Sequence, residues 1–356
     1  MKRRWAIPGK VMLAGEYSVL REGGIALVLA VDAGLELELE PPSASQSPLL
    51  VRRDTAVAWS GGPVPDELRF LHAGLAHSAP KRLFKAPFRV QLSSSPSAGV
   101  GTGATKPGLG GSASAAVGGL AVGYRLAGLV PSREVFLQAA VDVHRTAQAG
   151  RGSGYDVAAV AMGGLSVYQV DRISDGPGGR LVASAVPRPV PRGWSFCMAY
   201  AGRSASTTRL VGRLDALGPA AREDALIRLG ASVRPLVDAL GAGARAEVVN
   251  AVRHCDAALR EFDALTGVGV YTPEVDALLA VAHAMGCPCK VSGAGGGDSV
   301  VAFDREPDRL LALRSAWTAS GFHTYSPPVA RRGAWDAFFG PGDAPTDAAP
   351  SLDFHA

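Results

Sequence analysis

The pattern of apolar and polar positions predicts strands in the first part of the chain. Residues 25–31 are apolar without interruption, which is typical of a buried strand. Residues 35–40 alternate leucine with glutamate, which is typical of a strand with one exposed face. Two further strands are predicted at 88–92 and 165–170. Two helices are predicted at 112–127 and 132–149.

A segment rich in proline and glycine, at 175–193, is predicted to be the junction between two domains. The elements predicted beyond it are strands at 194–201 and 300–303 and helices within 207–262, at 273–285 and near 307–320. After about residue 340 the chain is rich in proline, alanine and aspartate, which is typical of a disordered tail. We therefore expect an N-terminal domain over 1–190, a C-terminal domain over 191–335 and a tail over 336–356.

Composition indicates an ordinary globular protein, because 47% of the 356 residues are hydrophobic and 19% are charged. The net charge is +4, and no basic cluster with interleaved aromatic residues occurs, so we expect no nucleic-acid partner. No apolar run reaches the roughly 20 residues of a membrane span, and Lys10 and Glu16 interrupt any signal-peptide core. A cytoplasmic protein with no membrane partner and with reduced cysteines is expected.

The most informative segment is a glycine loop that opens into the helix predicted at 112–127. Main-chain N–H groups at such a helix start, together with the helix dipole, form a site for a polyphosphate. The candidate cofactor-binding residues are Lys106, Gly108, Leu109, Gly110, Gly111, Ser112, Ala113 and Ser114. The Ser112 and Ser114 hydroxyls are each placed to cap the helix, contact a phosphate or bind Mg²⁺.

Two known phosphate loops fit this segment poorly. No Walker P-loop pattern is present, because neither Lys10 nor Lys106 is followed by serine or threonine. Gly108, Gly110 and Ala113 do match the dinucleotide-binding pattern G-x-G-x-x-A. That fold requires a strand directly before the first glycine, and the preceding residues form a loop-like run of serine, glycine and proline.

Two other segments extend the pattern, one at 8–20 (PGKVMLAGEYSVL) and one at 290–303 (KVSGAGGGDSVVAF). In order and spacing, the three segments resemble the three motifs of the galactokinase, homoserine kinase, mevalonate kinase and phosphomevalonate kinase (GHMP) superfamily. The resemblance covers nearly the whole chain. It implies a two-domain α+β fold, with an N-terminal half like domain 2 of ribosomal protein S5, a ferredoxin-like C-terminal half and an active site between them.

Within that superfamily the chain resembles the phosphomevalonate kinases. Tyr17 stands where mevalonate kinases usually carry histidine, and Asp298 stands where many relatives have another glycine. The segments at 152–159 (GSGYDVAA), 143–148 (VHRTAQ) and 267–274 (GVGVYTPE) are similar to segments of that group. The position of a glutamate that mevalonate kinases have ahead of the catalytic aspartate is occupied by Arg145, which leaves a second protein ligand for the metal unassigned.

The resemblance also implies roles for single residues. Lys10 and Asp156 match the catalytic lysine and aspartate, and Ser112 matches the serine that binds Mg²⁺. Each also has a plain structural reading: Lys10 as a surface lysine beside a turn, Asp156 as the cap of a helix starting at Val157, and Ser112 as a helix N-cap. The candidate substrate-binding residues are Glu16, Tyr17, His144, Gln148, Ser153, Ser206, Thr207, Ser292, Gly293, Ala294 and Gly295.

The resemblance thus implies an ATP- and Mg²⁺-dependent kinase that converts 5-phosphomevalonate to mevalonate 5-diphosphate. Its partners are a small phosphorylated acceptor and the nucleotide, and the sequence does not give the oligomeric state. Three alternatives stay open: a mevalonate kinase or another small-molecule kinase of the superfamily, a non-catalytic ligand sensor on the same fold, and a dinucleotide-dependent oxidoreductase.

Overall fold

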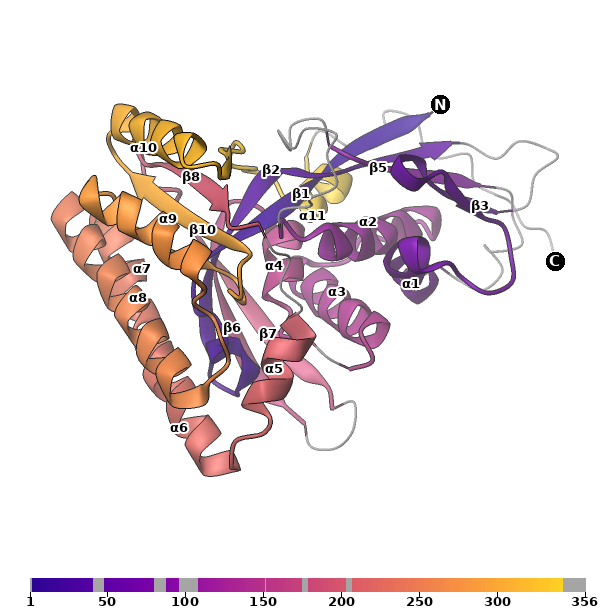
Figure 1. Cartoon of the computed structure of the whole chain (residues 1–356). Coiled ribbons are helices and arrows are strands. Elements are labelled where there is room, and N and C mark those ends of the chain that lie inside the picture. The colour runs from indigo at the N-terminus through magenta and orange to yellow at the C-terminus, as the bar shows by residue number, and fades with distance from the viewer. Residues whose placement is uncertain are drawn as a thin grey trace, which may run out of the picture.

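The computed structural model describes residues 2–40, 48–79, 88–95, 108–150, 152–174, 179–202 and 207–341, and these form two α+β lobes (Figure 1). The strands of the N-terminal lobe are β1 (Arg3–Ala14), β2 (Ile25–Glu40), β3 (Leu49–Arg52), β4 (Val57–Trp59), β5 (Arg89–Ser94), β6 (Leu165–Ile173) and β7 (Leu181–Arg188). They form one seven-stranded sheet in the order β4-β3-β5-β2-β6-β7, and β1 pairs antiparallel with β2.

The helices of the N-terminal lobe pack on one face of this sheet, as Figure 1 shows for the first three of them. They are α1 (Arg69–Ser78), α2 (Gly111–Leu126), α3 (Arg133–Ala147), α4 (Tyr155–Met162) and α11 (Ala334–Phe339), with short 3₁₀ turns at Ser18–Leu20, Arg53–Thr55 and Asp66–Leu68. The predicted helices at 112–127 and 132–149 are confirmed as α2 and α3.

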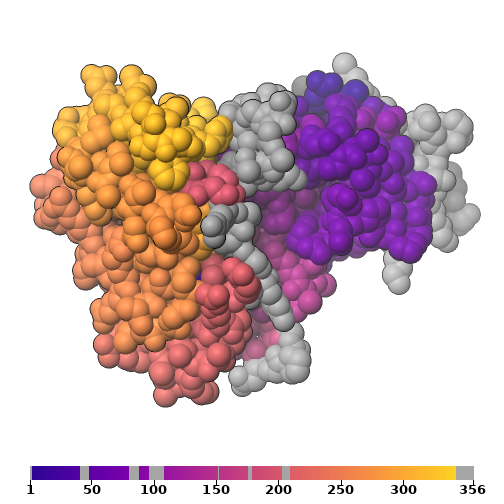
Figure 2. Space-filling model, viewed as in Figure 1, coloured from indigo at the N-terminus to yellow at the C-terminus, as the bar shows by residue number. Residues whose placement is uncertain are grey.

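The C-terminal lobe carries a four-stranded sheet in the order β11-β8-β10-β9, covered by helices. Its strands are β8 (Ser195–Tyr200), β9 (Cys289–Ser292), β10 (Ser299–Asp304) and β11 (His323–Tyr325). Its helices are α5 (Thr207–Leu214), α6 (Pro219–Ala231), α7 (Val233–Ala242), α8 (Arg245–Thr266), α9 (Pro273–Ala284) and α10 (Pro307–Ala319). Figure 2 shows the two lobes side by side, one in purple and one in orange.

The two predicted strands at 25–31 and 35–40 are one continuous strand, β2. Its two packing partners explain why residues 25–31 are all apolar. Ala26 and Val28 enter the core of the N-terminal lobe, whereas Leu27 and Leu29 enter a second core that is shared with β8, β10, α7 and α8 of the other lobe. Because a strand points successive side chains to opposite faces, burial on both faces requires an unbroken apolar run.

The structure corrects the predicted domain junction. Residues 181–188, which the sequence assigns to it, form β7, an edge strand paired antiparallel with β6. Pro187 argues against a strand here in the sequence. An edge strand nevertheless tolerates proline, because one side of its backbone needs no hydrogen-bond partner. The chain then enters the second lobe at β8.

The structure also corrects the C-terminal boundary and the start of the predicted tail. The chain returns to the N-terminal lobe near Pro328, whose carbonyl accepts a hydrogen bond from the Asp32 N–H at 2.8 Å. Helix α11 then packs into the N-terminal core, where the Phe338 ring stacks on Trp5 at a centroid distance of 4.3 Å. The rest of the tail, from residue 342, lies outside the described residues.

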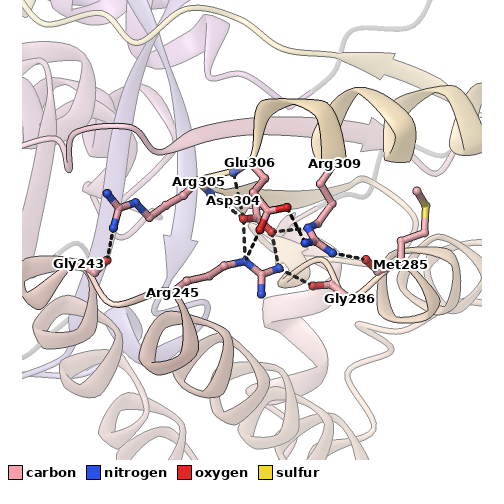
Figure 3. Close-up of polar contacts among 8 residues, drawn as sticks. All are labelled: Gly243, Arg245, Met285, Gly286, Asp304, Arg305, Glu306 and Arg309. Carbon is pink, nitrogen blue, oxygen red and sulfur yellow. Dashed lines mark hydrogen bonds and ion pairs between the residues drawn. The ribbon is translucent and has the colours of Figure 1, made fainter.

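An ion-pair cluster joins three elements of the C-terminal lobe (Figure 3). The buried Asp304 carboxylate, at the end of β10, accepts hydrogen bonds from Arg245 Nε and Nη2 at 2.9 and 2.7 Å. Arg309 of α10 lies 3.4 Å from the same carboxylate. Two basic residues thus neutralise one buried acid, which ties the starts of α8 and α10 to the sheet.

Two other predictions concern the molecule as a whole. All four cysteines are buried and unpaired, as expected for reduced thiols. Among the helices that the structure describes, none has both the length and the apolar character needed to span a bilayer.

Candidate active site

Lys10 is held against the glycine loop by its backbone and by its side chain. It lies on β1, and its N–H donates to the Leu109 carbonyl at 2.9 Å. Its aliphatic stem packs on Gly110, where a Cβ would stand 2.8 Å from Lys10 Cγ. Gly110 also has a φ of +88°, so glycine is required there for two reasons. The segment at 8–20, which is the first motif, and the glycine loop, which is the second, therefore meet at Lys10.

The Lys10 ammonium lies among groups that favour its charge. Its Nζ is 5.5 Å from the centroid of the Tyr155 ring. Burial by itself lowers the pKa of Lys10, but Tyr155, Asp156 and Asp298 act in the opposite direction and raise the pKa above its ordinary value. Lys10 is therefore a fixed positive charge, as its predicted catalytic role requires.

The first turn of α2 offers its main chain to a ligand. Gly110 is the N-cap, and the N–H groups that follow it have no acceptor within the helix. A Cβ at Gly111 would meet no other part of the described chain within 4 Å, so this side of the turn is open. Leu109 and Ala113 are buried, and they can therefore contribute only backbone groups to binding.

The two serines of the loop have different surroundings. Ser112 Oγ lies 3.3 Å from His144 Nε2 and is partly exposed, and Ser112 does not cap the helix. Ser114 is fully buried, and its hydroxyl donates to the carbonyls of Pro8 and Gly110 at 2.7 and 3.1 Å. The Ser114 hydroxyl therefore fastens α2 to β1, and a contact between Ser114 and the nucleotide stays a prediction.

Asp156 lies in the first turn of α4, which begins at Tyr155 and not at Val157. Gly154, with a φ of +82°, is the N-cap. Asp156 Oδ1 accepts a hydrogen bond from the Val157 N–H at 2.9 Å, so the helix-start contact expected from the structural reading is present. The same oxygen lies 3.7 Å from His144 Nδ1. The carboxylate is only partly buried, and its other oxygen remains for a ligand.

Asp298, at the end of the third motif, reaches the glycine loop from the other lobe. Its carboxylate accepts the Gly108 N–H, and a Cβ at Gly108 would stand 2.5 Å from Oδ2. Burial raises the pKa of Asp298 above its ordinary value, against the opposing effects of Lys10, Ser299 and the Gly108 N–H. All three motifs therefore converge around Lys10.

Four of the predicted substrate residues connect the lobes. Lys290 Nζ donates to Glu16 Oε1 at 2.5 Å, and both side chains are almost fully buried. The Tyr17 hydroxyl donates to the Ala294 carbonyl at 2.6 Å, and the Ser292 hydroxyl donates to the Met12 carbonyl at 2.9 Å. These polar atoms are thus paired across the lobe junction, and their contact with the substrate stays a prediction.

The other predicted residues fall into two groups. His144, Gln148 and Ser153 lie beside Asp156: His144 is buried, Gln148 Nε2 is 3.3 Å from His144 Nε2, and the Ser153 carbonyl accepts the Tyr168 hydroxyl at 2.5 Å. Lys106, Ser206 and the Thr207 side chain lie outside the described residues.

The third-motif glycines shape the loop that faces Tyr155. Gly293 and Gly295 have positive φ angles of 86° and 75°. A Cβ at Gly295 would stand 2.5 Å from Val270 Cγ1, so this glycine lets the loop pack on the segment before α9. Gly293 stands 3.9 Å from the Tyr155 hydroxyl, measured from its ideal Cβ position.

No metal cluster of three or more His, Cys, Asp or Glu side chains occurs within the described ranges. Arg145, at the position left open for a metal ligand, donates to the carbonyls of Gly152 and Gly179. It therefore fixes the loop that leads to Asp156. Neither Tyr155 nor Lys290 stands out in the sequence, because no spacing rule pairs Tyr155 with Lys10 or Lys290 with Glu16.

Comparisons with known proteins identify the family of the chain. Residues 72–164 match the GHMP kinases N terminal domain, and residues 236–323 match the GHMP kinases C terminal family. A phosphomevalonate kinase from Streptomyces sp. (strain CL190) is 29% identical over 88% of this chain and 93% of its own length.

Solved structures share the fold. The Lin0012 protein from Listeria innocua superposes with a TM-score of 0.78 at 22% identity, over 93% of this chain and 98% of its own. The Streptococcus pneumoniae phosphomevalonate kinase in complex with phosphomevalonate and AMPPNP superposes with a TM-score of 0.72 at 19% identity, over 92% of this chain and 99% of its own.

Proposed function

The chain belongs to the GHMP kinases, and on that premise we propose that it transfers the terminal phosphoryl group of ATP to 5-phosphomevalonate, forming mevalonate 5-diphosphate. The observation that carries the proposal is the convergence of Lys10, Asp156 and the open first turn of α2. Phosphoryl transfer requires a phosphate cradle, positive charge and a group that orients the acceptor, and these three features supply them.

The nucleotide phosphates would bind at the first turn of α2, where N–H groups and the helix dipole favour an anion. Mg²⁺ would be held by the Ser112 hydroxyl together with phosphate oxygens, and when bound it neutralises charge on the transferred group. The donor set fits this ion, because a hard cation prefers oxygen ligands and the Ser112 hydroxyl is partly exposed beside the open turn.

The acceptor oxygen of a phosphate ester is already largely ionised at neutral pH. Asp156 therefore acts mainly by orienting the acceptor, and no strong general base is needed. Lys10 lies close to both Asp156 and the glycine loop, so its charge offsets the repulsion between two phosphate groups. This arrangement suits a phosphorylated acceptor better than a neutral alcohol.

Support for the acceptor comes from the relative named phosphomevalonate kinase and from Tyr17 and Asp298 in the motifs. The test is to supply mevalonate and 5-phosphomevalonate separately with Mg²⁺ and ATP and to measure ADP release. We expect release with 5-phosphomevalonate only. Release with mevalonate alone, or with neither compound, contradicts the proposal, and a nicotinamide-binding titration checks the oxidoreductase alternative, for which no binding is expected.

A further inference from the structure

A buried histidine connects two of the proposed functional groups. His144 projects from α3 between α2 and α4, which lie beside it in Figure 1. Its Nε2 lies 3.3 Å from Ser112 Oγ, and its Nδ1 lies 3.7 Å from Asp156 Oδ1. Only 2% of its side chain is exposed, and the Phe70 ring covers it at a centroid distance of 5.2 Å. A bound acceptor therefore reaches Ser112 and Asp156 but not this ring.

The neighbours of the ring determine which nitrogen carries the proton. Gln148 Nε2 lies 3.3 Å from His144 Nε2. Gln148 Oε1 faces Gly152 instead, because a Cβ placed on that glycine would stand 2.5 Å from Oε1. With the Gln148 amide oriented in this way, its nitrogen donates to His144 Nε2. These contacts favour the tautomer with its proton on Nδ1.

The Nδ1 atom is buried and has no hydrogen-bond partner among the described atoms. The nearest negative charge is Asp156 Oδ1, which already accepts the Val157 N–H. A buried N–H is costly unless an acceptor or a negative charge faces it. Asp156 Oδ1, at 3.7 Å, is the group that Nδ1 faces, and the described residues offer it no other acceptor.

We propose that His144 is a positioning residue for the phosphoryl transfer proposed above. Its Nδ1–H binds Oδ1 of Asp156 on the side away from the acceptor, so that Oδ2 faces the acceptor. Its Nε2 accepts the Ser112 proton, so that the lone pairs of the Ser112 hydroxyl face the metal and the phosphates. One ring thus orients both the acceptor-binding group and the metal ligand, as hydrogen-bond partners behind metal ligands commonly do.

The first test measures the tautomer and does not depend on activity. Protein labelled with ¹⁵N-histidine is examined by NMR without substrate, with the exposed His283 as an internal reference. The expected spectrum shows a proton on Nδ1 and none on Nε2 of His144. A ring protonated on Nε2 contradicts the inference. Gln148→Met removes one of the two donors that face Nε2, and we expect it to increase the share of the tautomer protonated on Nε2.

The second test compares two substitutions that each keep half of the ring's contacts. His144→Asn keeps a donor near the Nδ1 position, and His144→Gln keeps a polar group near Nε2. We expect His144→Gln to lower kcat by about 10- to 100-fold with little change in the KM for ATP. We expect His144→Asn to raise the Mg²⁺ concentration needed for half-maximal activity and to lower kcat less.

Equal loss of kcat and of thermal stability in both variants would mean that His144 only fills the core, and would overturn the inference. The two proposals fail separately. If the wild-type protein does not phosphorylate 5-phosphomevalonate but His144 carries its proton on Nδ1, the proposed function fails and the tautomer stands. If the protein is active and the ring is protonated on Nε2, only the positioning role fails.

Discussion

At the scale of single residues, Ser112 and Ser114 show what a motif can and cannot predict. Both match a phosphate-loop pattern, but successive helical residues are rotated by about 100°, so residues two apart point in nearly opposite directions. Only Ser112 faces the open turn, and Ser114 donates to Pro8 inside the molecule. Helix geometry alone predicts that one of the pair is structural. Which one it is depends on where β1 lies, and the sequence does not give that.

Alanine substitution should separate the two serines. Ser112→Ala should raise the Mg²⁺ concentration needed for half-maximal activity by about tenfold with little change in stability, because it removes a partly exposed oxygen whose contact with His144 Nε2 is long, at 3.3 Å. Ser114→Ala should lower the free energy of unfolding by about 1–3 kcal/mol, because it leaves the buried Pro8 carbonyl without a donor. Metal-dependent kinetics and urea denaturation of both variants check this, and the same effect on both would contradict it.

Asp156→Asn tests the carboxylate that is proposed to orient the acceptor. The amide keeps the shape and can still accept the Val157 N–H, but it lacks the negative charge beside Lys10 and His144. We expect kcat to fall by about 10²- to 10⁴-fold, with ATP affinity nearly unchanged. Steady-state kinetics and nucleotide-binding calorimetry measure the two quantities. Losses of similar size in both would indicate a structural role for Asp156.

At the scale of elements, the sequence predicts the long amphipathic helices but leaves α1 unassigned. This helix is short, and Gly74 lowers its helical propensity. The reason for the glycine lies in its packing partner, because a Cβ at Gly74 would stand 2.1 Å from the Ala116 carbonyl oxygen of α2. The backbones of α1 and α2 are therefore in direct contact where the helices cross. A pattern along one helix does not show how closely another helix approaches it.

Gly74→Ala should therefore destabilise the protein although alanine favours helices. The added methyl group meets main-chain atoms that cannot rotate away, so we expect the free energy of unfolding to fall by about 1–3 kcal/mol. The matched control is Gly241→Ala on α7, where a Cβ meets nothing within 4 Å and a small gain in stability is expected. Urea denaturation checks both, and a stabilised Gly74→Ala would refute the close crossing.

The Asp304 cluster, which joins three elements of the C-terminal lobe, predicts a pH dependence. Burial raises the pKa of Asp304, but Arg245 and the N–H groups of Arg305 and Glu306 outweigh it, and the net pKa lies below its ordinary value. The stabilisation is therefore complete above the unfolded pKa of about 3.9, and it is lost as the pH falls through the folded pKa. Asp304→Asn should cost about 3–5 kcal/mol at pH 7.

The measurement is the difference in unfolding free energy between the wild type and Asp304→Asn from pH 7 down to pH 3.5. It should stay constant to about pH 5 and then shrink. Asp308→Asn on the exposed start of α10 is the control, and it should differ little from the wild type at any pH. A difference that grows as the pH falls would show that the folded pKa of Asp304 is not lowered.

At the scale of the whole molecule, the sequence indicates two lobes but not how they join. The apolar run in β2 shows that both faces are covered, without showing that α7, α8 and strands of the second lobe cover one of them. The return of the chain at Pro328 is hidden for a similar reason. Phe338 belongs to a short apolar group among glycine and proline, and it resembles a tail until Trp5 is placed beside it.

The buried Glu16–Lys290 pair lies at the lobe junction and supports the sharpest test of that arrangement. Removing one partner leaves the other charged and buried, so Glu16→Met and Lys290→Met should each lower the free energy of unfolding by about 3–5 kcal/mol. The double variant replaces both charges with apolar groups and should recover much of this loss. Denaturation of the four proteins forms a double-mutant cycle that isolates the pair's coupling.

The exposed pair Arg228–Asp224 on α6 provides the control cycle, and its coupling should stay below about 1 kcal/mol, because both side chains are solvated. A coupling of that small size for Glu16–Lys290 would mean that the two charges do not depend on each other. In that case the lobes are held by the shared apolar core and by the hydrogen bonds of Tyr17 and Ser292. A large coupling would show that the first and third motifs, which carry Lys10 and Asp298 respectively, are kept in register by one buried ion pair.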